Sequence, residues 1–298
     1  MSAQPSPKPS LKTLPNRRWR ALALGLSTVL GLRRQGFFIP HRYADRLPGP
    51  GERPAYAAAG ECLKAREGDF QSLLSRFGHY AAEFAAIGKE PPPAPRWDQT
   101  WFPRLDAAAA YTLVRERKPA RIVEVGSGHS TRFVARAVAD AGLSTKVTAI
   151  DPAPRAALSG LPIEWIRATL QQAGAAPFES LGPGDMVIID SSHILMPGSD
   201  VDSFFGHILP RLPAGILLHV HDIFLPDDYP VSWAWRGYNE QLLLLAYLHS
   251  AEWRSVWASH YVATRMAEAV EGSAAGALPL AEGAPESSLW LERSEAVT

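Results

Sequence analysis

Beyond residue 95 the chain alternates short apolar runs with longer amphipathic stretches, and this alternation constrains the fold most strongly. A strand that is covered by helices on both faces is apolar along its whole length, whereas a strand with one wet face alternates apolar and polar residues. Such runs alternating with helices predict a parallel sheet flanked by helices. Five near-continuously apolar runs fit this pattern: 121–125, 146–150, 163–167, 185–189 and 215–220.

Helical periodicity fills the intervals between these runs. It is clearest at 130–141, 202–212 and 238–249, where apolar residues recur with the spacing of one helix face. Two more β-like runs follow, at 255–262 and 288–292, and we expect the last strand to be antiparallel. The sequence therefore predicts an α/β fold with a doubly wound, mostly parallel seven-stranded sheet of Rossmann-like type.

The N-terminal third differs from this pattern. Residues 1–16 are rich in proline, serine and lysine, a composition that buries too little apolar surface to repay ordering, so we expect a flexible tail. Between residues 37 and 87 the apolar positions recur at helical spacing without a strand pattern. The proline-rich run 90–95 then breaks any helix. We therefore predict an N-terminal helical cap at 17–95 and a main domain at 96–298.

The basic run Arg17–Arg20, followed by the apolar run Ala21–Leu32, resembles the charged and apolar regions of a signal peptide. The apolar run is too short to span a bilayer, and Arg33–Gly36 follows in place of a small-residue cleavage site. Two interpretations stay open: a cleaved signal, and a short helix with basic ends that packs on the body or lies against a membrane surface. No transmembrane segment is expected.

The overall charge constrains the kind of partner. Thirty lysine and arginine residues balance thirty aspartate and glutamate residues, so the chain lacks the excess of positive charge with which proteins attract nucleic acid. We expect a small-molecule partner and no nucleic acid. The single cysteine, Cys62, excludes an internal disulfide and a cysteine-rich zinc site, so the cytoplasm is the default compartment. Whether the chain forms a homo-oligomer stays open.

A strand, a glycine turn and a helix start follow one another at Arg121–Thr131. Gly126 and Gly128 permit unusual backbone dihedrals and let a ligand approach without a Cβ in the way. The segment resembles the first motif of class I S-adenosylmethionine-dependent methyltransferases. That resemblance implies that Glu124 lies near the positively charged amino-acid part of the cofactor and that Gly126, Ser127 and Gly128 bind it. A structural tight turn is the alternative explanation.

A nicotinamide dinucleotide site is the main rival, because its fingerprint also opens a helix with spaced glycines. The third glycine of that fingerprint is missing here, and Thr131 stands in its place. A side chain at this position hinders close packing of the helix on the strand beside a pyrophosphate. S-adenosylmethionine has no pyrophosphate, so the departure favours the methyltransferase.

A second carboxylate, Asp151, ends the next apolar run, one strand–helix–strand unit after Gly126. The resemblance implies that Asp151 accepts hydrogen bonds from two ribose hydroxyls. It also places Ala168–Leu170, after the third strand, where such enzymes contact the adenine. An N-cap before Pro152 is the alternative for Asp151.

Polar residues follow the fourth and fifth apolar runs, Asp190 and His193 in one case and His221 and Asp222 in the other. The carboxyl ends of parallel strands form the ligand cleft of open α/β sheets, so these four residues should surround the donated methyl group, and Asp190 is also an expected cofactor contact. Aromatic residues in 99–103 and 225–235 should lie near this cleft. We expect them to pack a lid rather than to stack on a substrate.

From about Trp101 onward, the motifs resemble bacterial small-molecule O-methyltransferases, in particular macrolide-sugar O-methyltransferases and the related cephalosporin hydroxylase group. That resemblance implies a magnesium site, here Asp190, His221 and Asp222, with His193 beside it. His221 replaces a carboxylate of the family pattern, so the set suits magnesium less well than a softer transition metal. Whether the site binds a divalent metal therefore stays open.

The resemblance implies methyl transfer from S-adenosylmethionine to a small acceptor, and we expect a hydroxyl oxygen as the acceptor atom. A neutral imidazole can accept the hydroxyl proton near neutral pH, which favours His193 as the general base with His221 in reserve. Two other functions stay open. One is a metal-dependent oxidoreductase or hydroxylase on the same fold, and the other is a cofactor-binding protein without catalysis.

Overall fold

The computed structural model describes the backbone of residues 14–294 and the side chains from Trp19 onward. The chain forms two units, residues 1–53 and 54–298. The first contains helix α1 (Leu14–Val29) and the one-turn helix η1 (Ala44–Arg46). No described side chain between residues 19 and 53 is buried, so the described part of this unit has no core of its own. No helix in residues 14–294 combines the length and apolarity needed to cross a membrane.

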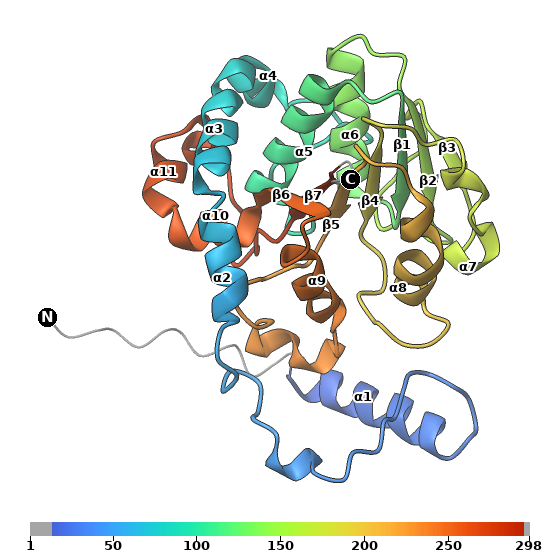
Figure 1. The fold of residues 1–298 in the computed structure, drawn as a ribbon. Coiled ribbons are helices and arrows are strands. Elements are labelled where there is room, and N and C mark those ends of the chain that lie inside the picture. Colours follow the sequence, from blue (N-terminus) through green and yellow to red (C-terminus); the bar gives the residue numbers. More distant parts are fainter. Residues whose placement is uncertain (1–13, 295–298) are drawn as a thin grey trace, which may run out of the picture. The chain divides into compact units, whose positions relative to one another are not determined.

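The second unit is built on a seven-stranded sheet with the order β3-β2-β1-β4-β5-β7-β6 (Figure 1). Its strands are β1 (Arg121–Val125), β2 (Lys146–Ile150), β3 (Glu164–Ile166), β4 (Met186–Ile189), β5 (Leu217–Val220), β6 (Trp253–Ala258) and β7 (Leu289–Arg293). Strands β1 to β5 pair in parallel, and β7 lies antiparallel between β5 and β6. This confirms the predicted fold class and the antiparallel last strand.

Helices cover the sheet on both faces (Figure 1), which explains why its central strands are apolar throughout. Val123 of β1 pairs with Val187 of β4, and all of Met186–Ile189 is buried. The helices of this unit are α2 (Ala57–Lys64), α3 (Glu67–Phe77), α4 (Ala81–Ala86), α5 (Arg104–Arg117), α6 (His129–Asp140), α7 (Leu170–Ala173), α8 (Asp200–Ser203), α9 (Glu240–Leu248), α10 (Ser259–Arg265) and α11 (Ala267–Glu271).

The early helices share their core with the sheet. Phe70 and Phe77 of α3 lie with their ring centroids 6.0 and 5.6 Å from that of Trp257 in β6. Phe84 of α4 makes an edge contact with Tyr111 of α5. The predicted boundary between residues 95 and 96 therefore lies inside the second unit, whose core continues across it. Residues 1–13 of the predicted tail lie outside the described residues, and residues 14–16 begin α1.

Two predicted elements differ from the structure. The predicted strand 255–262 ends at Ala258, and its second half begins α10, because a short apolar run in a buried helix has the same pattern as a buried strand. The predicted helix 202–212 is broken into α8, a π-helical turn (Phe204–Ile208) and a 3-10 turn (Leu209–Arg211). Pro210 lacks the N–H that a continuous α-helix would use there.

Four parallel strands end in one row at the same edge of the sheet. The residues that follow β1, β2, β4 and β5 are Gly126, Asp151, Asp190 and His221. Each of them donates its backbone N–H to the last carbonyl of a neighbouring strand, at distances from 2.9 to 3.1 Å. The hydrogen-bond ladder therefore extends one residue past the strands and fixes these four residues side by side.

Candidate functional site

The turn after β1 requires a glycine at its first position. Gly126 has a φ of +78°, and a Cβ at this position would lie 1.8 Å from the carbonyl oxygen of Asp190. The turn therefore lies directly on the end of β4, with no room for a side chain between them. A Cβ on Gly128 would meet only ordinary contacts, the nearest being the nitrogen of Ala156 at 3.8 Å.

The helix that follows this turn is capped by Thr131, which occupies the position of the missing third glycine. Its Oγ1 accepts a hydrogen bond from the N–H of Gly128 at 2.9 Å, and the side chain is fully buried. The N–H of Gly128 is therefore already bonded within the turn. A dinucleotide pyrophosphate needs free N–H groups and close helix packing here, so the observed geometry disfavours that ligand.

Asp151 links the end of β2 to the turn after β1. Its Oδ2 accepts hydrogen bonds from the backbone N–H of Ser127 at 2.8 Å and from the Ser127 hydroxyl at 3.0 Å. Its Oδ1 accepts from the N–H of Ala153 at 2.7 Å, a contact within a local turn, and the helix N-cap considered as the alternative is wrong because no helix begins at Pro152. Asp151 is half-buried, so it braces the turn and still faces the solvent-accessible space beside it.

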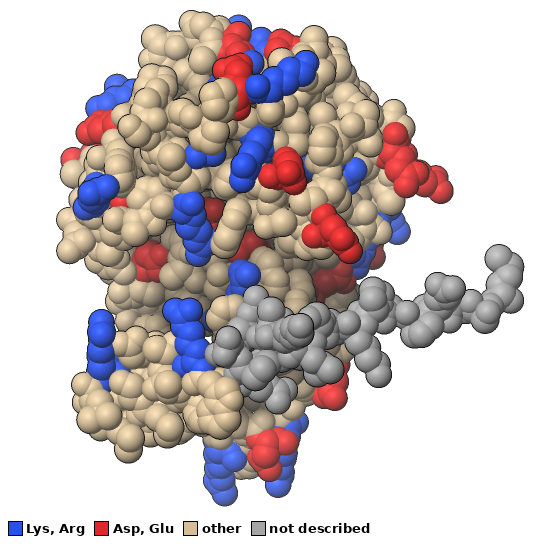
Figure 2. All heavy atoms as spheres, turned by 180° about the vertical axis from the view of Figure 1, so that it is seen from behind, with Lys and Arg blue, Asp and Glu red and all other residues tan. Residues whose placement is uncertain are grey.

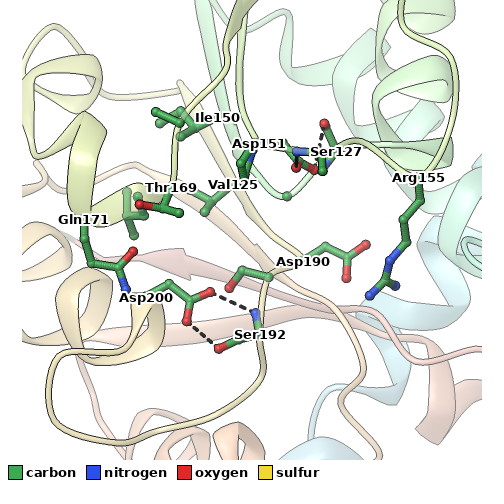
Figure 3. Close-up of a pocket in the computed structure, with 16 residues that line it drawn as sticks. Val125, Ser127, Ile150, Asp151, Arg155, Thr169, Gln171, Asp190, Ser192 and Asp200 are labelled. Atoms are coloured by element: carbon green, nitrogen blue, oxygen red, sulfur yellow. Dashed lines mark hydrogen bonds between the residues drawn. The ribbon is translucent and has the colours of Figure 1, made fainter. Parts of the chain in front are cut away.

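A cavity of about 450 Å³ opens at this edge of the sheet, within the size range of small-ligand sites. Figure 3 shows Asp151 and Ser127 along one side, Thr169, Gln171 and Asp200 along another, and Asp190 and Arg155 together at a third. The hydroxyl of Ser191, which also lines the cavity, is buried without a hydrogen-bond partner among the described residues. An unsatisfied buried hydroxyl at a cavity wall fits a ligand that forms hydrogen bonds.

Glu124 lies beneath the turn, fully buried, and is not part of the cavity wall. Its Oε1 accepts a hydrogen bond from the hydroxyl of Ser130 in α6, and its Oε2 has no partner among the described residues. Burial raises the pKa of Glu124 to about 8, although the hydrogen bonds from Ser130 and Thr131 oppose the shift. The carboxyl group is therefore mostly protonated at neutral pH.

Replacing Glu124 with glutamine should stabilise the protein in a pH-dependent way. The carboxyl ionises near pH 4.5 in the unfolded chain and near 8 in the folded one, so wild-type stability falls as pH rises between these values. Glutamine removes this loss, which amounts to at most about 5 kcal/mol at 1.36 kcal/mol per pKa unit. Urea unfolding of the wild type and the variant at pH 5 and pH 8 measures this difference in the free energy of unfolding. An equal effect of Glu124→Gln at both values, or an effect matched by the exposed control Glu179→Gln, would show that Glu124 is not protonated.

A cluster of imidazoles and carboxylates lies next to the cavity, at the ends of β4 and β5. His193 is almost fully buried, and its Nε2 lies 3.4 Å from Asp190 Oδ1 and 3.4 Å from Asp222 Oδ2. Its Nδ1 lies 2.9 Å from Oε2 of Glu240, at the start of α9. Glu240 thus holds one ring nitrogen, and the other faces the two aspartates.

His221 repeats this arrangement from the other side of the cluster. Its Nε2 lies 3.2 Å from Oδ2 of Asp106 in α5, and its Nδ1 lies 3.6 Å from Asp190 Oδ1 and 3.4 Å from Asp222 Oδ1. Asp106 is fully buried and also accepts hydrogen bonds from the backbone N–H groups of Ser287 and Ser288. Each histidine is therefore oriented by one buried carboxylate and presents its second nitrogen to Asp190 and Asp222.

The charges of the cluster support one another. Burial alone would raise the pKa of Asp190, but His221 and His193 hold it well below its ordinary value. Burial alone would lower the pKa of both histidines, but their carboxylate partners hold it well above 6.5. His193 and Asp222 also have positive φ values, 59° and 58°, in the left-handed region that strains the backbone of non-glycine residues.

The cluster also offers metal ligands. Asp190, His193 and Asp222 each present a donor atom within 4.8 Å of the other two. His221, predicted as a ligand in place of His193, contacts both aspartates but does not belong to this three-residue group. Two carboxylates and an imidazole suit manganese, iron or zinc better than magnesium, which prefers an all-oxygen shell. The donor set therefore fits a divalent transition metal.

A second cavity of about 240 Å³ meets the first at Asp190 and Arg155, which line both. His221 and Asp222 form its floor with Asp190, whereas His193 is not part of its wall. The aromatic side chains of Trp101 and Trp233 and the basic side chain of Arg236 complete it, with Thr100, Gly283 and Pro285. Trp101 and Trp233 therefore lie at the cleft, as expected, and line its second cavity.

Of the remaining expected site residues, Gly126, Ser127 and Asp151 line the first cavity with Asp190, and so do Ala168, Thr169 and Leu170. Glu124 and Gly128 do not. Four residues of the site were not predicted from the sequence: Arg155, Asp200, Asp106 and Glu240. Asp106 and Glu240 each lie in the first turn of a helix, where a carboxylate is ordinarily explained by the helix dipole, so no local signal marked them.

Comparison with known families matches this part of the chain. The model of a family described as a methyltransferase domain matches residues 123–223. These residues run from the middle of β1 to the turn after β5, so they include the ends of all the parallel strands and the row of residues from Gly126 to His221. No curated protein matches the chain.

Three solved structures are similar to the chain at low identity. The O-methyltransferase TomG from Streptomyces achromogenes, in complex with SAM, is 15% identical, with 75% of this chain and 90% of that chain covered and a TM-score of 0.40. The O-methyltransferase from Bacillus cereus, in complex with SAH, is 13% identical, with coverages of 75% and 91% and a TM-score of 0.40. The SAH-bound methyltransferase PaMTH1 from Podospora anserina is 15% identical, with coverages of 87% and 100% and a TM-score of 0.41.

Proposed function

We propose that this chain, whose residues 123–223 match the model of a methyltransferase domain, transfers the methyl group of S-adenosylmethionine to a hydroxyl oxygen of a small molecule. One observation carries the proposal. The cavity beside Gly126 and Asp151 meets a second, aromatic-lined cavity at Asp190, directly beside two oriented histidines. A donor and an acceptor held in these two cavities would meet at one point.

The first cavity has the groups that a sulfonium nucleoside needs. Asp151 would accept hydrogen bonds from the ribose hydroxyls, and Ala168–Gln171 with Asp200 would enclose the adenine. Ser127, Asp190 and Arg155 surround the opposite end, where a carboxylate can face the ammonium group of the cofactor and the guanidinium its carboxylate. Glu124 would act from beneath, by holding Ser130 and the turn in place.

The second cavity would hold the acceptor. When bound, S-adenosylmethionine supplies a methyl group on a positively charged sulfur, which is already a strong electrophile. The main task of the protein is therefore to align the acceptor oxygen with that methyl group. Trp101 and Trp233 offer apolar faces for a small acceptor, and the shared wall at Asp190 sets the direction of approach.

His221 would take up the proton of the acceptor hydroxyl in its neutral form, and because its carboxylate partners outweigh burial and hold its pKa well above 6.5, turnover should rise with pH. His221 lines the second cavity and is oriented by Asp106, so we place it first, ahead of His193, which lies behind the two aspartates. His193 would support it by holding Asp190 and Asp222 in position. A general base held in this way contributes about 10²- to 10⁴-fold to the rate.

Product formation tests the proposal directly. The full chain would be incubated with S-adenosylmethionine and a pool of small hydroxylated aromatic and sugar-like compounds, and S-adenosylhomocysteine would be measured by mass spectrometry. We expect acceptor-dependent formation of S-adenosylhomocysteine, with a matching mass increase of one methyl group in the acceptor. A protein that binds S-adenosylmethionine but forms no product with any pool would support the non-catalytic alternative instead.

Replacing Asp151 with alanine should weaken the binding of S-adenosylmethionine. The change removes a charged acceptor for two ribose hydroxyls, and hydrogen bonds to charged groups contribute about 1.5–3 kcal/mol each, so we expect at least a ten-fold rise in Kd. Calorimetric titration measures it, with Glu179→Ala as an exposed carboxylate control. An unchanged Kd in Asp151→Ala would disprove the ribose contact.

The metal-dependent oxidoreductase remains the second candidate because Asp190, His193 and Asp222 fit a transition metal. These residues would hold the ion, which when bound would orient a substrate hydroxyl and lower its pKa. Metal analysis of the purified protein, with turnover measured with and without oxygen, separates the two functions. Methyl transfer that is independent of oxygen favours our proposal, and oxygen-dependent turnover without S-adenosylhomocysteine favours the alternative.

A further inference from the structure

The N-terminal segment has a charge unlike that of the rest of the chain. Between residues 17 and 42 the sequence has six arginines (Arg17, Arg18, Arg20, Arg33, Arg34 and Arg42) and no aspartate or glutamate, although the whole chain is neutral. Figure 2 shows the part of this segment beside the grey residues as a mostly tan surface bordered by blue side chains. On the second unit, by contrast, red and blue side chains are interspersed.

The same segment exposes most of the large apolar side chains. Of the eighteen large hydrophobic residues that are exposed in the described chain, twelve lie between Trp19 and Leu47. They are Trp19, Leu22, Leu24, Leu26, Val29, Leu30, Leu32, Phe37, Phe38, Ile39, Tyr43 and Leu47. The most exposed of them include Leu32 at 77% and Phe38 at 68%. Such a concentration of apolar surface marks an interaction site.

Basic and aromatic side chains are interleaved within the segment. The guanidinium carbon of Arg34 lies 4.9 Å from the ring centroid of Phe37, and those of Arg42 and Arg46 lie 5.3 and 5.5 Å from that of Tyr43. Arginine side chains that contact aromatic rings can lie together with them at the interface between an apolar phase and water. There the rings enter the apolar phase and the guanidinium groups face anions.

Helix α1 is too short to span a bilayer. Its sixteen residues are about 24 Å long at 1.5 Å per residue, shorter than the roughly 30 Å of a hydrocarbon core. A helix of this kind, apolar from Ala21 to Leu26 and flanked by arginines, suits the interface between headgroups and acyl chains. Anionic headgroups would complement the uncompensated positive charge.

We propose that residues 19–47 form a docking surface for a lipid bilayer that carries anionic headgroups. In the docked state Trp19, the leucines of α1 and Phe37–Ile39 enter the interface, and the arginines on either side contact the headgroups. The docking is peripheral and reversible, and it places the methyltransferase domain beside a membrane without a spanning segment.

Sedimentation with vesicles tests this surface on the full chain. At low salt we expect the protein to sediment with vesicles of phosphatidylcholine and phosphatidylglycerol and to stay in solution with phosphatidylcholine alone. Arg33→Glu combined with Arg34→Glu should reduce the bound fraction at least ten-fold, and so should Phe37→Ser combined with Phe38→Ser. The matched controls are Lys89→Glu with Arg211→Glu, and Val231→Ser with Leu280→Ser, all at exposed positions of the second unit.

Several results would overturn the proposal. One is an absence of binding to anionic vesicles, and another is binding that the controls reduce as much as the segment variants do. A third is a dimer in light scattering that Phe37→Ser with Phe38→Ser dissociates, which would assign the surface to a second copy of the chain. A fourth is a lowered melting temperature of this variant without vesicle binding, which would show that the segment packs on its own protein.

Discussion

Gly126→Ala is expected to cost at least about 3 kcal/mol of the free energy of unfolding and to abolish measurable cofactor binding. A left-handed backbone already costs an alanine about 1–2 kcal/mol. The added Cβ would also lie 1.8 Å from the Asp190 carbonyl oxygen and 2.7 Å from its carbon, so both the turn and the end of β4 must move. Urea unfolding and calorimetric titration with S-adenosylmethionine measure the two effects.

Gly142→Ala provides a matched control for this experiment. Gly142 follows α6 with a φ of +60°, but a Cβ there would meet nothing within 4 Å. It should therefore show the backbone cost of about 1–2 kcal/mol alone and leave cofactor affinity unchanged. If Gly126→Ala were no more destabilising than Gly142→Ala and still bound the cofactor, the close approach of the turn to β4 would not exist.

His221→Ala is expected to lower kcat by about 10²- to 10⁴-fold while the affinity for S-adenosylmethionine changes little. The side chain lines the acceptor cavity and not the cofactor cavity, so its loss should affect the acceptor step more than cofactor binding. The assay is S-adenosylhomocysteine formation with the identified acceptor, run beside titrations of the cofactor. His207→Ala, at an exposed position in the π-helical turn, is the control.

The comparison with His193→Ala distinguishes the two histidines. Removing either histidine leaves a fully buried carboxylate without its imidazole partner, so both variants should lose stability. The loss should be smaller in His221→Ala, because Asp106 keeps the backbone N–H groups of Ser287 and Ser288. Wild-type turnover in His221→Ala would contradict its role as proton acceptor. Wild-type turnover and stability in His193→Ala would contradict its role in holding the cluster.

The sequence predicted the sheet well because each buried strand carries its own apolar signal. The bounds of β1 and β2 agree with the predicted runs, and the strand-end residues Asp151, Asp190 and His221 follow from topology alone once the strands are parallel. The apolar pattern predicted the wrong element where a single residue determines the backbone geometry. Pro210 breaks a helix whose apolar spacing is otherwise continuous, and Ser259 begins a helix inside an apolar run.

The partners of the site were beyond prediction, because they come from distant parts of the chain. Asp106 approaches His221 across 115 positions of sequence, and Glu240 approaches His193 across 47. Neither carboxylate has a local motif, and only the packing of α5 and α9 on the sheet places them. The resemblance implied that Glu124 lies near the cofactor, and the structure shows its carboxyl group buried beneath the turn, where it accepts a hydrogen bond from Ser130.

Calorimetric titration of the full chain with S-adenosylmethionine, and in parallel with NAD, tests the central claim most directly. The claim is that the turn at Gly126 and the carboxylate of Asp151 enclose a sulfonium nucleoside. We predict saturable binding of S-adenosylmethionine at one site, weakened in Asp151→Ala, and no saturable heat with NAD. Saturable binding of NAD with no heat from S-adenosylmethionine would contradict it.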